Sequence, residues 1–371
     1  MAKLIENYPN FGFGLMRLPQ DGSGAIDIEK AKQMVDLFID NGFVYFDTAY
    51  AYPGSEEAVN AALVQRYPRD KYILATKLSA YDIKSGEEGR QIFQVSLERT
   101  GAGYFDYYLL HNLGENRTSV YDTYKLWDFA AELKSKGLVK HVGFSFHDKA
   151  DVLDKLLTAH PEMEFVQLQI NYIDWENAAI ESHKCYDVAR KHGKPIFVME
   201  PCKGGSLAGF LPDDVKALFR DTNPNASCAS WAIRFAASLE GVEVVLSGMS
   251  SLEQVEDNIS FMKSFMPLSA EERDVIECAR EMLSAYPTVP CTACFYCTKN
   301  CPAGIPIPHI IKSLNRYVVF SDRQVAQSSY DWDTRFGNKA STCAGCGKCE
   351  YACPQHIKIR EQMKKASEIF D

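Results

Sequence analysis

The chain has 371 residues, of which 46% are hydrophobic, and it carries a formal net charge of −9. This acidic balance argues against a nucleic-acid partner and against an anionic membrane surface, because both select for clustered lysine and arginine. No apolar run reaches the roughly 18 residues of a membrane-spanning helix, and the first residues lack the hydrophobic region of a signal peptide. We therefore expect a soluble, cytoplasmic protein.

Eight short apolar runs of strand character alternate with helical patterns. They cover Phe11–Met16, Phe43–Phe46, Tyr72–Thr76, Tyr107–Leu110, Val139–Phe144, Glu164–Ile170, Pro195–Met199 and Val242–Leu246. Eight strands that alternate with helices predict a (β/α)8 TIM barrel. A doubly wound sheet is the competing fold, but the first run is not followed by the G-x-G-x-x-G turn that opens a helix in dinucleotide-binding sheets.

The helical patterns between the strands have recognisable ends. Asp27 is the expected N-cap of the first helix, and Tyr121–Lys136 is predicted to form one long amphipathic helix. After the eighth strand, Ser269 and Glu272 form the signature of a capping box. Local chemistry therefore predicts where several helices begin.

Polar side chains follow the second, third and fourth strands at the points where the apolar runs end. Asp47 follows the second run, and Tyr52 comes shortly after it in the next loop. Lys77 follows the third run and His111 the fourth. The C-terminal ends of parallel barrel strands meet at one face, where such folds carry their active sites. We therefore expect these four side chains to lie together.

This set of side chains suits the addition of hydride to a carbonyl group, in which negative charge grows on the oxygen and a proton has to be supplied. Tyr52 is the expected acid. Its unperturbed pKa of about 10 is high for that task near neutral pH, so a cation that stabilises the phenolate is needed, and Lys77 is the candidate. Asp47 would hold the lysine in its charged form, and His111 would orient or polarise the carbonyl oxygen.

The same residues belong to motifs that resemble those of the aldo-keto reductase family, over roughly Phe11 to Phe261. The similar segments are F-D-T-A-Y-A-Y from Phe46, A-T-K from Ala75, Y-Y-L-L-H-N from Tyr107, V-G-F-S from Val142 and S-G-M-S-S-L-E-Q-V-E-D-N from Ser247. The resemblance implies a nicotinamide cofactor, NADP(H) or NAD(H), which binds in an extended form across the barrel top without a Rossmann fold.

The resemblance also implies which residues contact this cofactor. Ser145 and Gln167 would hold the carboxamide, and the loop from Lys203 to Leu207 would approach the pyrophosphate. The complete set of implied cofactor-binding positions is Met16, Ser145, Gln167, Met199, Lys203, Gly204, Gly205, Leu207, Gly248, Ser250, Gln254, Asp257 and Asn258.

Three departures from the family's pattern concern this cofactor. Met199 stands where many members place a tyrosine that stacks on the nicotinamide, and Phe146 stands where many place an asparagine after the serine of strand five. Gly248 and Gln254 stand where NADP-specific members often carry lysine and arginine for the 2′-phosphate. The sequence therefore leaves the choice between NADP and NAD open.

The end of the chain has a different composition. Pro287 and Pro290 interrupt the helical pattern, and eight of the twelve cysteines follow in two tight clusters. Such clusters in a cytosolic chain indicate metal ligands before disulfides. We therefore expect two domains, residues 1–287 with the barrel and residues 288–371 with the cysteines.

Both cysteine clusters have the form C-x2-C-x2-C-x3-C-P. In ferredoxins with this spacing, three close thiolates bind three corners of a cubane, and the distant fourth ligates the other cluster. We assign one [4Fe-4S] cluster to Cys291, Cys294, Cys297 and Cys353, and the second to Cys343, Cys346, Cys349 and Cys301. Two structural zinc sites are the alternative, but zinc needs only two C-x2-C pairs, which leaves this spacing unexplained.

Two helical patterns, Pro308–Phe320 and Gln324–Phe336, separate the cysteine motifs, so the module resembles an α-helical ferredoxin. The whole chain is thus similar to the branch of aldo-keto reductases with a fused C-terminal 4Fe-4S ferredoxin-type domain. We expect NAD(P)H-dependent reduction of a small carbonyl substrate, or oxidation of the corresponding alcohol, with Tyr52 as proton donor. No motif specifies which substrate this is.

The alternative is an electron-transfer or redox-sensing docking protein, whose barrel binds nicotinamide nucleotide without turnover and whose clusters pass electrons to a redox protein partner. Nicotinamide transfers electrons as hydride pairs, whereas each cluster typically passes one electron. A flavin normally connects the two, and no flavin motif is recognisable. The sequence leaves open whether the clusters transfer electrons or are structural.

Overall fold

The computed structural model describes residues 4, 10–80, 83–178, 180–209, 211–320, 323–335 and 337–371. The chain divides into two compact units. The first comprises Met1–Pro201 and Ala232–Leu268, and the second comprises Cys202–Trp231 and Ser269–Asp371. The domain boundary that we expect after residue 287 stays a prediction.

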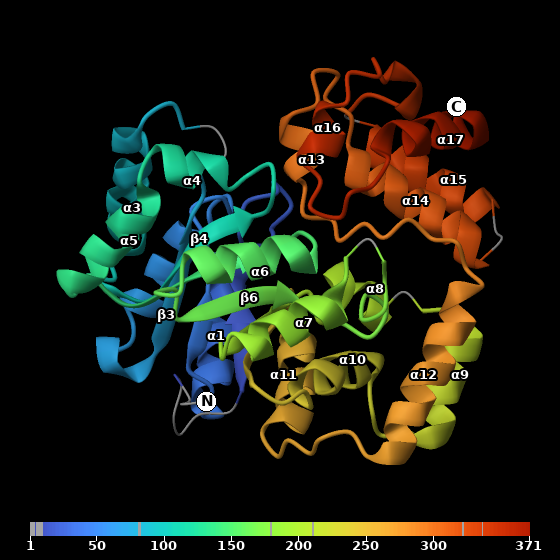
Figure 1. Ribbon diagram of the computed structural model, residues 1–371. Coiled ribbons are helices and arrows are strands. Elements are labelled where there is room, and N and C mark those ends of the chain that lie inside the picture. Colours follow the sequence, from blue (N-terminus) through green and yellow to red (C-terminus); the bar gives the residue numbers. More distant parts are fainter. Residues whose placement is uncertain are drawn as a thin grey trace. The chain divides into compact units, whose positions relative to one another are not determined.

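Eight parallel strands form the centre of the first unit and close into a barrel in chain order (Figure 1). They are β1 (Phe11–Gly14), β2 (Tyr45–Asp47), β3 (Ile73–Leu78), β4 (Phe105–Leu113), β5 (Val139–Phe146), β6 (Phe165–Gln169), β7 (Ile196–Met199) and β8 (Val242–Ser247). The predicted TIM barrel is confirmed. Strands β4 and β5 extend beyond their predicted ends, because their pairing continues past an irregularity between Leu110 and Leu113.

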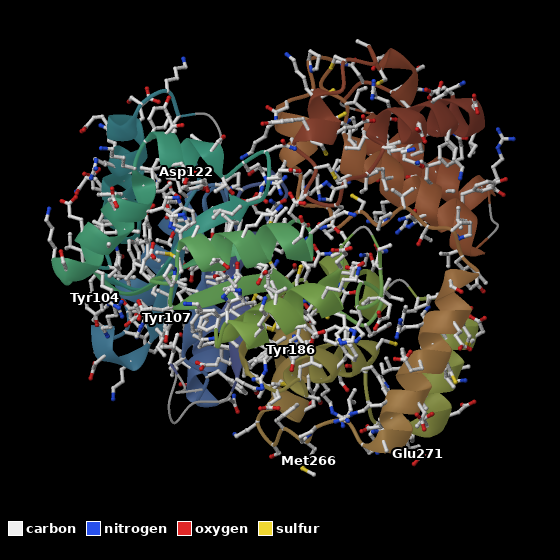
Figure 2. All side chains as sticks on the ribbon, viewed as in Figure 1. Tyr104, Tyr107, Asp122, Tyr186, Met266 and Glu271 are labelled. Carbon is white, nitrogen blue, oxygen red and sulfur yellow. The ribbon has the colours of Figure 1, made fainter. Side chains whose placement is uncertain are left out.

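Aromatic side chains fill the interior of the barrel. Tyr107, which Figure 2 labels, lies with its ring centroid 5.3 Å from that of Phe165 and 5.3 Å from that of Phe197. Phe165 and Phe197 stack at 4.5 Å. All three rings are buried. Such a packed interior leaves the C-terminal ends of the strands as the place for a site in this fold.

Helices connect the strands of the first unit. They are η1 (Leu15–Arg17), α1 (Ile28–Asp40), α2 (Ser55–Val59) with the π-helical turn η2 (Asn60–Val64), η3 (Arg69–Lys71), α3 (Gly86–Thr100), α4 (Ser119–Thr123), α5 (Leu126–Ser135), α6 (Ala150–Ala159), α7 (Ser182–Lys191) and α11 (Leu252–Met262), while α10 (Cys228–Ala237) crosses from one unit to the other. The Asp27 side chain accepts a hydrogen bond from the backbone N–H of Lys30, as its predicted N-cap role requires.

The prediction of one helix over Tyr121–Lys136 is wrong. The chain forms two helices, α4 and α5, and Lys125 between them has a left-handed φ of 54°. The Tyr121 hydroxyl lies 2.7 Å from the His111 carbonyl oxygen and 3.0 Å from that of Leu78, so α4 is fixed to the ends of β3 and β4. Helix α5 packs instead along α3 and β5, which requires a change of direction at Lys125.

The second unit is mostly helical, and the helical character that was predicted for residues 288–371 is confirmed. It contains η4 (Lys203–Gly205), α8 (Ser206–Gly209), α9 (Asp213–Thr222), α12 (Ala270–Ser284), α13 (Tyr296–Lys299), α14 (Ile307–Phe320), α15 (Arg323–Thr334), η5 (Ala340–Thr342), α16 (Lys348–Tyr351) and α17 (Ile359–Phe370). The capping box of Ser269 and Glu272 at the start of α12 is confirmed. The predicted helix over Gln324–Phe336 corresponds to α15, and its last residue lies outside the described residues.

The core of the cysteine-containing region lies between three of these helices. Helix α14 packs against α15 and α17, and their buried residues include Ile310, Leu314 and Tyr330 (Figure 1). The short helices α13 and α16 also pack against each other. In the described part of the chain, no helix combines the length and the apolar character that crossing a membrane requires.

Candidate functional site

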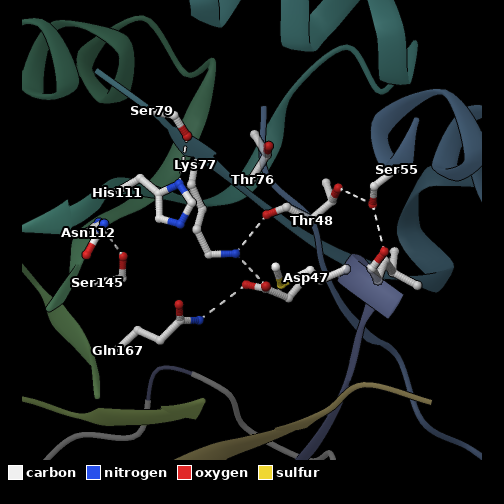
Figure 3. A network of polar contacts seen from close by, with 12 residues as sticks. Asp47, Thr48, Ser55, Thr76, Lys77, Ser79, His111, Asn112, Ser145 and Gln167 are labelled. Atoms are coloured by element: carbon white, nitrogen blue, oxygen red, sulfur yellow. Dashed lines mark hydrogen bonds and ion pairs between the residues drawn. The ribbon is translucent and has the colours of Figure 1, made fainter. Parts of the chain in front are cut away.

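A buried ion pair lies at the C-terminal end of the barrel (Figure 3). The Lys77 ammonium donates hydrogen bonds to Asp47 Oδ1 and, over 2.8 Å, to the Thr48 carbonyl oxygen. Gln167 Nε2 donates to the other carboxylate oxygen of Asp47 at 3.3 Å. Burial raises the pKa of Asp47 and lowers that of Lys77, because each charged form loses hydration, and their pairing opposes both shifts. Each of the two buried charges is therefore stabilised by the other.

Tyr52 and His111 complete the group of four side chains. The Lys77 Nζ atom lies 4.9 Å from the centroid of the Tyr52 ring, and the Tyr52 and His111 rings meet edge to face at 5.9 Å. The structure thus brings together Asp47, Tyr52, Lys77 and His111 as the strand ends predicted. Their catalytic roles stay predictions.

Hydrogen bonds of Ser55 and Glu56 anchor the loop that carries Tyr52 to three neighbouring strands of the barrel. Ser55 Oγ donates to the Leu15 carbonyl oxygen at 3.0 Å and lies 2.7 Å from Thr48 Oγ1 (Figure 3). Glu56, the next residue of α2, is buried and accepts a 2.8 Å hydrogen bond from Thr76. These contacts attach the start of α2 to β3 and to the ends of β1 and β2. The C-terminal end of the loop that carries Tyr52 is therefore held in place.

Sequence reasoning missed Ser79, whose hydroxyl lies 2.6 Å from His111 Nδ1 and holds the imidazole ring in place. A signal for it was available, because Ser79 follows Lys77 by two residues, and alternate residues of a strand face the same side. Asn112 was also missed. Its backbone has a left-handed φ of 61°, which sequence patterns do not reveal for a residue other than glycine.

Asn112 is a buried polar residue at this end of the barrel. Its backbone N–H donates to Ser145 Oγ at 2.7 Å, and the residue as a whole is 3% exposed. The Oδ1 atom has no hydrogen-bond partner among the described residues. An orphaned buried acceptor is costly, so this oxygen is available for a hydrogen bond from a ligand or a water molecule.

The expected cofactor residues of the first unit lie at or beyond the strand ends. Ser145 and Gln167 are buried on β5 and β6, Met199 ends β7, and Met16 lies in η1. Gly248 and Ser250 follow β8, and Gln254, Asp257 and Asn258 lie on α11. The Asn258 amide donates to Ser247 Oγ at 2.8 Å, so it also fastens α11 to β8.

The expected pyrophosphate loop belongs to the second unit. Lys203, Gly204 and Gly205 have successive left-handed φ values of 46°, 65° and 94°, and Leu207 is buried in α8. A Cβ added at Gly204 would overlap the Thr292 backbone. This loop therefore packs directly on the chain between Cys291 and Cys294.

Backbone conformations repeat in the two cysteine motifs. Ala293 and Phe295 have left-handed φ values of 51° and 62°, and the equivalent Gly345 and Gly347 have 68° and 77°. The first motif thus holds two ordinary side chains in a conformation that favours glycine. Ala293 donates its N–H to Cys291 Sγ at 3.4 Å, as backbone groups do around metal-bound thiolates.

The thiols of the first motif have a neighbour from the second. Burial raises the pKa of the Cys297 thiol, and the nearby thiolates of Cys294, Cys291 and Cys353 raise it further. Cys353 is therefore close enough to Cys297 for their charges to interact, and both belong to the buried core of this region. Among the described residues no three His, Cys, Asp or Glu side chains converge on a single ion, and a cubane does not require this, because each thiolate binds a different iron.

A model of the Aldo/keto reductase family matches residues 10–281. The chain belongs to the aldo/keto reductase family. It is an NAD(P)-dependent oxidoreductase with a C-terminal 4Fe-4S dicluster domain, whose model matches residues 290–357. An aldo-keto reductase of Mycolicibacterium vanbaalenii is 28% identical over 64% of this chain and 80% of its own length. An uncharacterized oxidoreductase of Bacillus subtilis is 25% identical over 67% of this chain and 85% of its own length.

Solved structures resemble the barrel. The holo form of an aldo-keto reductase from Bacillus halodurans has a TM-score of 0.60 and 25% identity, and the match covers 73% of this chain and 91% of that one. A Klebsiella pneumoniae aldo-keto reductase in complex with NADPH has a TM-score of 0.59 and 19% identity, with coverage of 75% and 95%. The second similarity concerns the fold alone.

Proposed function

We propose that this reductase transfers hydride from NAD(P)H to a small carbonyl compound, with Tyr52 as the proton donor. The observation that carries the proposal is the buried Asp47–Lys77 pair, whose ammonium lies 4.9 Å from the Tyr52 ring centroid. The reverse reaction oxidises the corresponding alcohol. Two further features of the site support this chemistry, and the cysteine motifs carry a separate part of the proposal.

The first support concerns the proton. As hydride reaches the carbonyl carbon, the developing alkoxide takes a proton from the Tyr52 hydroxyl, and a phenolate remains. The buried charge of Lys77 stabilises that phenolate in surroundings where water does not screen it. Asp47 keeps the ammonium charged, and Ser79 holds His111, which would orient the oxygen of the carbonyl group.

The second support concerns the cofactor. NAD(P)H supplies the hydride when bound. The carboxamide of a nicotinamide carries an NH2 donor, which fits the orphaned Oδ1 of Asn112, and an oxygen, which fits a donor such as the Ser145 hydroxyl. Asn112 thus compensates for the asparagine that other family members place after strand five. Gln167 on β6 would provide a further hydrogen bond to the carboxamide.

The separate part of the proposal concerns iron. The spacing of the dicluster motifs, and the interaction between the charges of Cys353 and Cys297, favour two [4Fe-4S] clusters with the interlocked ligand sets that the spacing predicts. When bound, such clusters transfer single electrons or cross-link the chain. The contact between Gly204 and Thr292 joins the first motif to the expected pyrophosphate loop, within the second unit.

The proposal is tested by anaerobic turnover with NADPH and NADH over a panel of aldehydes and ketones, before and after iron removal. We expect stoichiometric oxidation of nucleotide and formation of alcohol with at least one carbonyl class. Nucleotide binding without turnover of any carbonyl or alcohol would instead indicate a docking or sensing protein.

A further inference from the structure

The loop Lys203–Leu207 packs against the first cysteine motif, and both segments belong to the second unit. A Cβ added at Gly204 would overlap the Thr292 carbonyl oxygen, and it would lie 2.8 Å from the carbonyl carbon and 2.9 Å from the Cα atom of Thr292. Thr292 is 2% exposed. The two backbones therefore approach each other so closely that no side chain fits at Gly204.

The loop has a backbone conformation that needs support from its surroundings. Lys203 has a left-handed φ of 46°, and Gly204 and Gly205 follow with positive values. Such a conformation at a residue other than glycine is costly, and it persists only where the surrounding structure enforces it. Lys203 is itself buried. The contact with the Thr292 backbone supplies part of this support.

The segment that leads to Thr292 is fixed by helix α14. Asn315 on this helix accepts a 2.7 Å hydrogen bond from the Val289 N–H and donates a 2.8 Å hydrogen bond to the Val289 carbonyl oxygen. The same carbonyl oxygen accepts a 2.8 Å hydrogen bond from the Cys291 N–H. Val289 and Cys291 both pack against the core of the cysteine region. A continuous series of contacts thus connects α14, the first cysteine motif and Gly204.

We propose that Thr292 is a positioning residue for the nucleotide. Its backbone holds the loop Lys203–Leu207 in the conformation that binds the nucleotide, so iron loading of the first motif and nucleotide binding strengthen each other. This inference rests on the proposed function, which makes the nucleotide the ligand of this loop. Cys291 and Cys294 flank Thr292, and iron-bound thiolates at these two positions leave the Thr292 backbone a single place.

The first experiment measures the Kd for NADPH and, separately, for NADH by anaerobic calorimetry, with the wild type loaded with iron and depleted of it. Iron removal should raise the Kd about fivefold or more, within the usual range of coupling between two sites. Because such coupling is reciprocal, saturating nucleotide should also slow the loss of the visible absorbance to a chelator.

An unchanged Kd after complete iron removal would overturn the inference, while the binding itself would leave the proposed function standing. If the loaded wild type binds neither nucleotide, both proposals fail.

Gly204→Ala tests the contact itself in the iron-loaded protein. The added Cβ overlaps backbone, so the loop and the motif have to separate. The Kd should rise about fivefold or more, and a chelator should remove iron faster than from the wild type even without nucleotide. Failure of this variant to retain iron after purification would be a stronger form of the same result.

Gly205→Ala is the matched control for iron retention. Gly205 has a φ of 94°, but a Cβ added there meets no atom within 4 Å, so the substitution strains the loop without touching the motif. Its iron should be lost at the wild-type rate in the absence of nucleotide. If Gly204→Ala and Gly205→Ala lost iron equally fast, the contact with Thr292 would not connect the loop to the motif.

Asn315→Ala reaches the same contact from the motif and alters neither the loop nor a cysteine. Loss of its two hydrogen bonds to Val289 should raise the Kd about two- to fivefold. Gln327→Ala is the control, because Gln327 on α15 donates a 3.0 Å hydrogen bond to the Phe370 carbonyl oxygen in the same region. Its Kd should equal that of the wild type, and an equal rise in both variants would contradict the inference.

Discussion

The barrel site and the cysteine motifs hold their reactive groups in opposite ways. At the barrel, Asp47 and Lys77 neutralise each other, and Thr48 and Gln167 satisfy further hydrogen bonds. In the motifs, the Cys297 thiol is buried among other thiols, whose negative charges oppose its ionisation. The ion pair of the first site is satisfied without a ligand, and the second site needs iron to bring its thiolates together. Damage to the barrel site should therefore affect chemistry, and damage to the motifs should affect folding.

The largest expected effect tests the barrel half of this comparison. Tyr52→Phe removes the proposed proton donor but no contact of the Asp47–Lys77 pair. We expect kcat to fall by about 10²–10⁴, the usual contribution of a general acid, while Kd for nucleotide and Tm change little.

Tyr50→Phe is the matched control, because Tyr50 lies in the same loop and its ring contacts the Arg99 guanidinium at 4.8 Å. Steady-state kinetics of both variants provide the measurement. If Tyr52→Phe retained more than about a tenth of the wild-type kcat, another group would be the acid.

Removal of iron tests the expectation that damage to the cysteine motifs affects folding. Chelation under reducing, anaerobic conditions should unfold the cysteine region, since metal binding in such modules is part of the folding free energy. Limited trypsin digestion should then cut after Lys299 and Lys339, which flank the helices α14 and α15. The barrel should persist as a resistant fragment. An unchanged digestion pattern after complete iron loss would show that the helices fold without clusters.

Loss of one ligand should distinguish the interlocked ligand sets from sequential ones, in which all four cysteines of one motif bind the same cluster. In Cys301→Ala, the cluster of Cys343, Cys346 and Cys349 loses its fourth ligand, although Cys301 precedes it by a long stretch of chain. We expect iron content to fall from about eight toward about four per chain.

Alkylation of the folded protein, followed by mass spectrometry, locates the exposed thiols. Cys343 and Cys346 should become labelled in Cys301→Ala, while Cys291 and Cys294 stay protected. Cys278→Ala, an exposed cysteine outside the motifs, should leave the labelling of all eight motif cysteines unchanged. Selective labelling of the first motif would refute the interlocked ligand sets.

The smallest expected effect compares the two motifs with each other. Gly345 has a φ of 68°, and a Cβ added there meets no atom within 4 Å, so Gly345→Ala adds conformational strain and no clash. We expect a loss of about 1–2 kcal/mol in the stability of the cluster region. Ala293→Gly at the equivalent position should relieve such strain.

Denaturant titration that follows the visible absorbance of the clusters measures the stability of the cluster region in both variants. The midpoint should fall for Gly345→Ala and should not fall for Ala293→Gly. If both substitutions lowered it equally, the left-handed backbone would not be what distinguishes the motifs.

Much of this protein follows from local properties of its sequence. Strand and helix periodicity predicted the eight-stranded barrel, because one face of each element must be apolar to be buried. The positions of Asp47, Lys77 and His111 after apolar runs predicted their convergence, because parallel strands end at one face. The cysteine spacing also predicts that Cys353 ligates the cluster of the first motif, and this assignment stays a prediction. In each case neighbouring residues carry the information.

Only the tertiary structure decided the remaining features. The break at Lys125 arises because Tyr121 bonds to the ends of two strands, and the unpaired Oδ1 of Asn112 arises at an irregularity in strand pairing. Gly204 packs on Thr292 because the folded second unit brings these two distant segments together. These contacts join residues far apart in the chain, and they depend on register and backbone conformation, which local patterns do not encode.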